Sequence, residues 1–125
     1  MPSASVPAEV QQFIVDYIQS AEQLDILILL FFEREQEWEP EAVSKRVFTT
    51  PSSAQGKLDS LVEAGFLAKT GSGRYRYAPG SPQLHAKLEL LGAAYRENRG
   101  AVLEAVFAKN LNPVKSFADA FRFGK

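Results

Sequence analysis

The amino-acid sequence predicts a mainly α-helical fold with one small β-hairpin, and two periodicities support this fold class. Apolar residues recur at helical spacing along most of the chain, whereas residues 66–78 alternate with the period of two that is typical of strands. The chain has 125 residues, of which 46% are hydrophobic, so it can form one domain with a substantial core. We therefore expect a core domain with helical extensions at both ends.

The first part of the chain is expected to form two helices after a flexible tail over residues 1–7. One stripe of an amphipathic helix is formed by Val10, Phe13, Ile14, Tyr17 and Ile18. Ser20, with Gln23 three residues later, matches a capping box, which predicts that a second helix runs from residue 21 to about residue 36. Its centre is apolar on nearly every face, so other elements must cover it on several sides.

A closely spaced pair of helices is expected next. Pro40 suits the first position of a short helix over residues 40–46, and Thr50-Pro51 is an N-cap followed by another first-turn proline. The helix that starts there is expected over residues 51–64, and Gly65 is placed to end it. The inner stripe of this helix consists of Ala54, Leu58, Leu61 and Val62.

Two short strands are expected over residues 66–70 and 74–78, joined by Gly71-Ser72-Gly73. The second strand alternates arginine and tyrosine from Arg74 to Tyr77, which puts both arginines on one face and both tyrosines on the other. Pro79-Gly80 ends the hairpin, and with it a domain that is expected to span residues 8–80.

Residues 81–125 are expected to form a C-terminal helical extension. Ser81-Pro82 starts a long helical region that reaches about residue 109, and Gly100 is the position where it is expected to kink or divide. This region is too apolar for a solvated spacer, and two arrangements stay open. It packs back on the domain together with the first helix, or it pairs with its copy across a two-fold axis, which predicts a homodimer.

A last short helix is expected from Asn112-Pro113. It belongs to a tail that is rich in phenylalanine, namely Phe117, Phe121 and Phe123. Three exposed phenylalanines would form an unusual apolar surface, so the tail is expected to dock on the domain or on the other subunit. A groove on a separate partner protein is the alternative.

The net charge of −1 conceals an uneven distribution along the chain. Residues 1–42 contain nine acidic side chains and one basic one, whereas residues 43–77 contain six basic and two acidic ones. Residues 78–125 contain seven basic and four acidic ones. Such a separation can orient a protein on a polyanion even when its total charge is near zero, and an ordinary solvated surface is the alternative.

The sequence lacks residues that several functional classes require. The chain has no cysteine, no export signal over residues 1–9, and no apolar run near the ~20 residues of a membrane span. His85 is the only histidine, and no zinc cluster, phosphate-binding glycine loop or Ser–His–acid arrangement is visible. We expect a cytoplasmic protein that is not an enzyme and holds no cofactor or metal. A solvated face is expected for the acidic run Glu33, Glu35, Glu37, Glu39 and Glu41.

From residue 21 to residue 78 the expected order is a buried helix, a short helix, a tight turn, a second helix and a β-hairpin. The segments that show this order most clearly are Trp38–Ser44, Ser53-Ala54, Leu58–Leu67 and Gly73–Pro79. Through these segments the chain resembles the winged helix-turn-helix family of DNA-binding transcription regulators. The run over residues 58–67 looks very much like that family's second helix as it enters the wing.

The resemblance implies that residues 51–64 are a recognition helix that enters the major groove of double-stranded DNA, and that residues 66–78 form a wing. Hydroxyls and backbone N–H groups at a helix start suit phosphates, an amide can read an adenine edge, and an ammonium holds a phosphate or a guanine. The outward positions near the start of the helix are Ser52, Ser53, Gln55, Gly56 and Lys57. The wing offers Lys69, Arg74 and Arg76 to the phosphate backbone or a minor groove.

Each of these positions also has an ordinary structural interpretation. The polar helix positions form a solvated face, and the wing arginines cover the tyrosines and pair with carboxylates. Gly56 has two explanations of its own, close approach of DNA or close packing against another helix. Glu39 stands where a Ser, Thr or Asp cap is more usual, and the outer face of the second helix has one lysine and no arginine. These departures predict modest DNA affinity unless two copies bind together.

Two functions therefore stay open. The basic stretch at residues 43–77 favours a DNA-binding transcription regulator. The acidic first half and the Phe-rich tail favour a winged helix that serves protein–protein assembly, because one fold hosts both functions.

Overall fold

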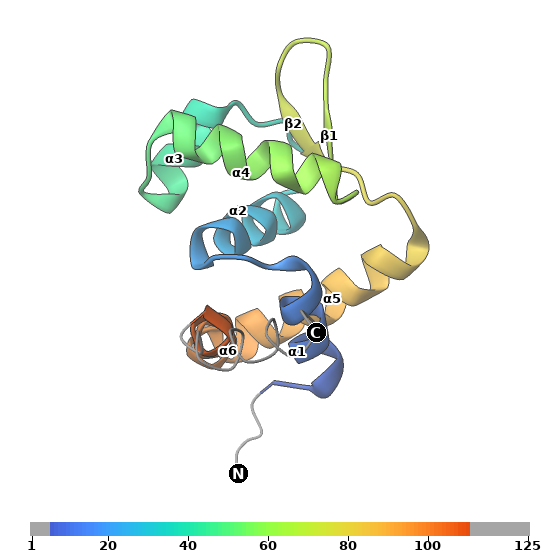
Figure 1. Ribbon diagram of the computed structural model, residues 1–125. Coiled ribbons are helices and arrows are strands. Elements are labelled where there is room, and N and C mark those ends of the chain that lie inside the picture. The colour runs from blue at the N-terminus through green and yellow to red at the C-terminus, as the bar shows by residue number, and fades with distance from the viewer. Residues whose placement is uncertain (1–5, 111–125) are drawn as a thin grey trace, which may run out of the picture.

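The computed structural model describes residues 6–110, with side chains through residue 108 (Figure 1). The described chain is mainly α-helical and carries one hairpin, as the sequence predicts. The predictions for residues 1–5 and for the Phe-rich tail lie outside the described residues. The elements are α1 (Ala8–Tyr17), α2 (Ala21–Phe32), α3 (Pro40–Val47), α4 (Pro51–Glu63), β1 (Leu67–Lys69), β2 (Tyr75–Tyr77), α5 (Pro82–Glu97) and α6 (Arg99–Asn110).

Side-chain caps start three of the helices where the sequence predicts them. The Ser20 hydroxyl accepts a hydrogen bond from the backbone N–H of Gln23 at the start of α2. The Thr50 hydroxyl accepts from the backbone N–H of Ser53 at the start of α4. The Ser81 hydroxyl accepts from the backbone N–H of Leu84 at the start of α5. Each cap satisfies one of the backbone donors that a helix start leaves without a partner. Gly65, at φ 94°, follows α4 in the left-handed region, which confirms its predicted place at the helix end.

Helix α2 ends at Phe32, four residues earlier than predicted. Residues 33–36 form a turn in which the backbone N–H of Gln36 donates to the carbonyl of Glu33. The turn brings Trp38 alongside the hairpin, where its backbone exchanges two hydrogen bonds with Tyr75, at 2.7 and 2.8 Å. This pairing replaces a further turn of helix, and the sequence pattern marks Trp38 only as an interruption.

The hairpin pairs Leu67 with Tyr77 and Ala68 with Arg76 in an antiparallel register. Both strands are shorter than predicted, because Thr70 and Gly73 already form the turn: the backbone N–H of Gly73 donates to the carbonyl of Thr70. Gly73 has φ 84°, a conformation that glycine adopts at little cost. The alternation is confirmed, since Tyr77 is buried and Arg76 is exposed.

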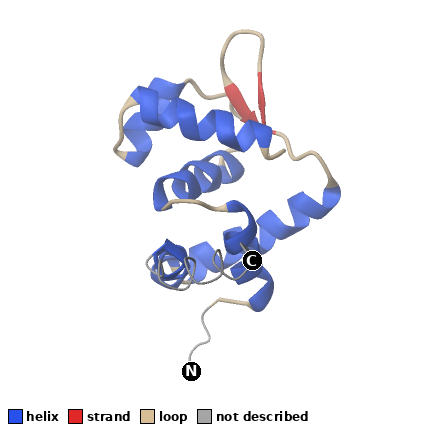
Figure 2. Ribbon diagram, viewed as in Figure 1, coloured by secondary structure: helices blue, strands red, loops and turns tan. Residues whose placement is uncertain are grey.

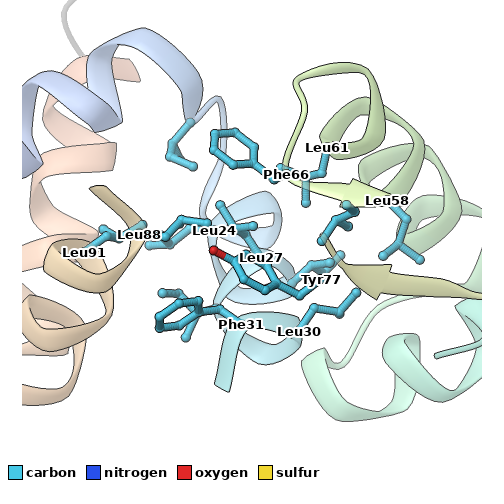
Figure 3. Close-up of a cluster of buried hydrophobic side chains, with 14 of the residues drawn as sticks. Leu24, Leu27, Leu30, Phe31, Leu58, Leu61, Phe66, Tyr77, Leu88 and Leu91 are labelled. Carbon is cyan, nitrogen blue, oxygen red and sulfur yellow. The ribbon is translucent and has the colours of Figure 1, made fainter. Parts of the chain in front are cut away.

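Helix α2 lies at the centre of the molecule, with helices on both sides of it, while the hairpin lies at one end (Figure 2). Leu24 and Leu27 of α2 are fully buried. Figure 3 shows them between two groups of side chains, from α4 and the turn before β1 on one side and from α5 on the other. This arrangement confirms the prediction that the apolar second helix is covered on several sides. The labelled residues of the two groups are Leu58, Leu61 and Phe66, and Leu88 and Leu91.

The C-terminal helical region divides at Asn98, two residues before the expected position at Gly100. Asn98 leaves the helical conformation, and its side-chain oxygen accepts from the backbone N–H of Ala101, so it caps the start of α6. Gly100 then lies inside the first turn of α6. Helices α5 and α6 both pack against α1, and Val102 and Val106 of α6 are buried. This region therefore packs back on the domain, and pairing with a second copy stays a prediction.

Candidate nucleic-acid interface

The outer face of α4 presents three of the five positions that the sequence singles out. Ala54 and Leu58 are buried against the core, so Ser52, Gln55 and Gly56 are exposed on the opposite face. They occupy the first half of the helix, near the positive end of the helix dipole. Pro51 has no N–H group, and the backbone N–H groups of Ser53 and Ala54 donate to Thr50. This part of α4 is therefore suited to an anion or to the edge of a base.

The other two positions, Ser53 and Lys57, are half-buried and turn towards α2. The Ser53 hydroxyl donates to the Oε2 atom of Glu22 at 2.6 Å, and the Lys57 ammonium lies 4.0 Å from the same oxygen. Glu22 belongs to the first turn of α2. Sequence reasoning missed this partner, because no local pattern relates residues that are 31 positions apart.

The wing carries three exposed basic side chains in different surroundings. Arg74 forms an ion pair with Glu39, with 3.4 Å between Nε and Oε2. The Lys69 ammonium lies 5.4 Å from the centre of the Tyr75 ring, in a cation–π contact. Arg76 has no ion-pair partner within the part of the chain that the structure describes. Of the two wing arginines, Arg76 therefore has the guanidinium that is free to bind a phosphate.

Gly56 lies in open space. A Cβ atom added there would meet no atom within 4 Å, apart from its own helix backbone. Close packing against another helix therefore does not explain this glycine within residues 6–110. Gly92 in α5 shows the contrasting case, since its added Cβ would lie 2.8 Å from the Phe31 ring.

Two partly buried hydrogen bonds connect α4 to its neighbours. The Tyr75 hydroxyl donates to Asp59 at 2.5 Å, which joins the wing to α4, and the Gln23 amide donates to the Ser60 hydroxyl at 3.1 Å, which joins α2 to α4. Burial raises the pKa of Tyr75 above its ordinary value, and the neighbouring carboxylate of Asp59 raises this pKa further. The wing and α4 therefore form one connected surface.

The acidic run beside the wing is mostly solvated, as predicted. Glu33 is the exception, since it is half-buried and pairs with Arg46 at 2.8 Å. Glu39 flanks the start of α3 without a side-chain cap. The exposed members of the run are Glu35, Glu37, Glu39 and Glu41.

His85 has a structural setting. Its Nδ1 atom is 2.8 Å from the Tyr77 hydroxyl, and its Nε2 atom is 3.4 Å from Glu89. Among the residues that the structure describes, no group of three metal-ligating side chains gathers in one place. No helix within residues 6–110 has both the length and the apolar character needed to cross a membrane.

Two hollows lie away from α4 and the wing, and the sequence indicated neither. An open groove of about 970 Å³ runs between the end of α2 and the second half of α5. A smaller hollow of about 290 Å³ lies beside the turn between α3 and α4, where Phe48 is 93% exposed. The lining residues shared by the two hollows are Phe32 and Glu33.

Comparison with known proteins identifies the fold. No family model matches the sequence. No curated protein matches it either. Among solved structures, the chain is similar to the transcriptional regulator Tm0710 of Thermotoga maritima, with 17% sequence identity and a TM-score of 0.52. The match covers 94% of this chain and 86% of that one. The predicted fold class is therefore confirmed, and the chain has a winged helix-turn-helix fold in which α3 and α4 are the paired helices and the β1–β2 hairpin is the wing.

Proposed function

We propose that this protein is a DNA-binding transcription regulator that contacts the duplex through α4 and the wing. The observation that carries the proposal is the placement of exposed polar side chains at the start of α4 and of an arginine without an ion-pair partner on the neighbouring hairpin. Figure 1 shows α4 and the hairpin on the side of α2 that lies opposite α1, α5 and α6. The structural similarity to a transcriptional regulator supports the same function.

In this proposal α4 is the recognition helix, which enters the major groove. Ser52 binds phosphate through its hydroxyl and its backbone N–H group, and Gln55 reads an adenine edge. Gly56 allows the DNA backbone to approach the helix closely. Ser53 and Lys57 join them by exchanging Glu22 for a phosphate oxygen.

The wing supplies the sequence-independent part of the binding energy. Arg76 and Lys69 bind the phosphate backbone or line a minor groove. Arg74 contributes less, because a phosphate must compete with Glu39 for its guanidinium. Few unpaired cations face the DNA, so each single domain binds with modest affinity.

A homodimer would compensate for modest affinity by placing two α4 helices on neighbouring half-sites. Two large apolar side chains of the C-terminal region stay exposed, Leu90 on α5 at 43% and Phe107 on α6 at 47%. Both lie in the region for which the sequence predicts pairing. We propose that the two-fold interface of the dimer includes this surface.

The test is fluorescence anisotropy of the purified protein with random-sequence duplex DNA across a salt series. Arg76→Ala should weaken binding and reduce the salt slope by about 1, because one phosphate contact is lost. Arg74→Ala should weaken binding less. Lys87→Ala, which removes an exposed charge from α5, is the matched control and should leave binding unchanged.

A second candidate function is protein–protein assembly without DNA binding. The exposed acidic side chains beside the wing and the exposed Phe48 ring favour it. If the folded protein fails to bind duplex DNA even at low salt, the DNA hypothesis is rejected and this second function takes its place.

A further inference from the structure

We propose that Glu22 is an internal competitor for DNA, a carboxylate of the protein that occupies the position of a phosphate at the start of the recognition helix. This inference rests on the proposed DNA-binding function and concerns how tightly the same surface binds. It assigns a role to a residue outside the helix-turn-helix pair.

The surroundings of the Glu22 carboxylate are those of a bound phosphate. Its Oε2 atom accepts a 2.6 Å hydrogen bond from the Ser53 hydroxyl and lies 4.0 Å from the Lys57 ammonium. Ser53 lies in the first turn of α4, where the positive end of the helix dipole also favours an anion, and Lys57 lies one turn further along the helix. A hydroxyl, an ammonium and a helix start are the groups by which proteins hold phosphate oxygens.

Glu22 is fixed in place yet within reach of solvent. It belongs to the first turn of α2, which the Ser20 cap and the buried Gln23 hold against α4. Its side chain is 28% exposed, and that of Lys57 is 34% exposed. A DNA phosphate can therefore approach this position, but the carboxylate repels it and already engages two of the donors.

Two consequences follow for binding. DNA must displace Glu22 before Lys57 and Ser53 become available, so the wild-type protein binds less tightly than its exposed donors suggest. Because the Lys57 ammonium is paired with Glu22, it neutralises no DNA phosphate and releases no counterion. The salt slope of binding is therefore shallower than the number of basic residues predicts.

The substitution Glu22→Gln tests this role, because glutamine keeps an oxygen that accepts from Ser53 and removes the charge. The variant should bind random-sequence duplex about two- to fivefold more tightly at low salt, the range for one exposed ion pair. Its salt slope should be steeper by about 1, since one more cation meets a phosphate. In a Lys57→Gln background the same change should steepen the slope little.

Glu9→Gln is the matched control. Glu9 is also a first-turn glutamate, and it lies on α1, on the opposite side of α2 from α4. This variant changes the net charge by the same amount as Glu22→Gln, and it also removes a negative charge from the first turn of a helix. It should bind DNA as the wild type does. Thermal unfolding of each variant confirms that it is folded.

The outcomes separate the two proposals. If the wild type binds DNA and Glu22→Gln matches Glu9→Gln in affinity and salt slope, the role of Glu22 is wrong while the DNA-binding function stands. A weaker Glu22→Gln variant would show that Glu22 positions the donors instead, and would also overturn the inference. If the wild type and both variants fail to bind, the DNA-binding function falls and this inference with it.

Discussion

Two glycines inside helices show how differently one residue type is used. Gly56 faces open space on α4, whereas Gly92 of α5 lies against the ring of Phe31. In an exposed helix position alanine is more favourable than glycine by roughly 1 kcal/mol. An unpacked glycine at this place therefore costs stability, and the structure within residues 6–110 shows no packing that offsets this cost.

Gly56→Ala should raise the free energy of unfolding by about 0.5–1 kcal/mol, because the new methyl group meets no neighbour and the unfolded chain loses freedom. It should at the same time weaken DNA binding, since the methyl group would separate the helix from the phosphate backbone. Urea unfolding and anisotropy measure the two effects.

Gly92→Ala supplies the contrast for stability, and it should destabilise the fold because its Cβ would clash with the Phe31 ring. If Gly56→Ala is stabilised and binds DNA unchanged, close approach of DNA does not explain this glycine.

Tyr77 couples stability to alkaline pH. Burial raises the pKa of Tyr77 to about 12, with Arg34 opposing the shift and Glu89 adding to it. Between pH ~10, where an unfolded tyrosine ionises, and pH ~12, the folded state keeps a proton that the unfolded state loses. Stability should therefore be complete below pH ~10 and fall as the pH rises to ~12, by up to about 3 kcal/mol.

Urea unfolding at pH 9 and pH 11.5 measures this loss of stability. Tyr77→Phe should lose less stability over the same interval, because it has no proton to release at this position. Equal losses in the two proteins would contradict this origin for the alkaline sensitivity.

At the scale of elements, helix α3 ends on an unusual residue just before the turn to α4. Phe48 caps α3 at φ 61°, in the left-handed region, with its ring 93% exposed. A residue with a Cβ atom pays roughly 1 kcal/mol or more for this conformation, and an exposed ring offsets little of that cost. The end of α4 has Gly65 in the same left-handed region, and glycine adopts this conformation at little cost because it has no Cβ atom.

Phe48→Gly should therefore raise the thermal midpoint of the protein, with a stabilisation of about 0.5–1 kcal/mol. Phe48→Ala is the matched control, since it removes the ring but keeps the Cβ atom, and it should change stability little. If the glycine variant is less stable than the alanine variant, the left-handed conformation is not what limits this turn.

The starts of helices follow from short-range chemistry, so the sequence predicts them well. The Ser20, Thr50 and Ser81 caps all lie where the pattern places them. The ends are predicted less well. After the early end of α2 the chain turns and Trp38 pairs with Tyr75, a partner distant in sequence that no local pattern reveals. The C-terminal helices divide at Asn98, a local cap that the prediction overlooked in favour of Gly100.

At the scale of the whole molecule, the candidate site shows the same limit. The outward direction of Gln55 and Arg76 follows from helix and strand periods, and the structure agrees with it. The carboxylates that pair with Lys57 and Arg74 belong to other elements, and only the folded chain brings them near. Sequence periodicity therefore identifies which side chains face outward, but it does not show which of them remain available to DNA.

The proposed dimer makes a prediction at this scale. Replacing both Leu90 and Phe107 with aspartate should halve the mass measured by light scattering, because these exposed apolar side chains would face charged copies across the two-fold axis. Gln83→Asp, at another exposed position of α5, should keep the dimer. A wild-type protein that is monomeric at high concentration would contradict the proposed interface.

The most direct test of the central claim is NMR mapping of the protein backbone as duplex DNA is added. We expect the largest shift changes at Gln55 and Gly56 on α4 and at Lys69 and Arg76 on the wing, with the exposed face of α5 around Leu90 unchanged. Shift changes that are absent, or that concentrate on α5 and α6, would contradict the claim that this winged helix binds DNA through α4 and the wing.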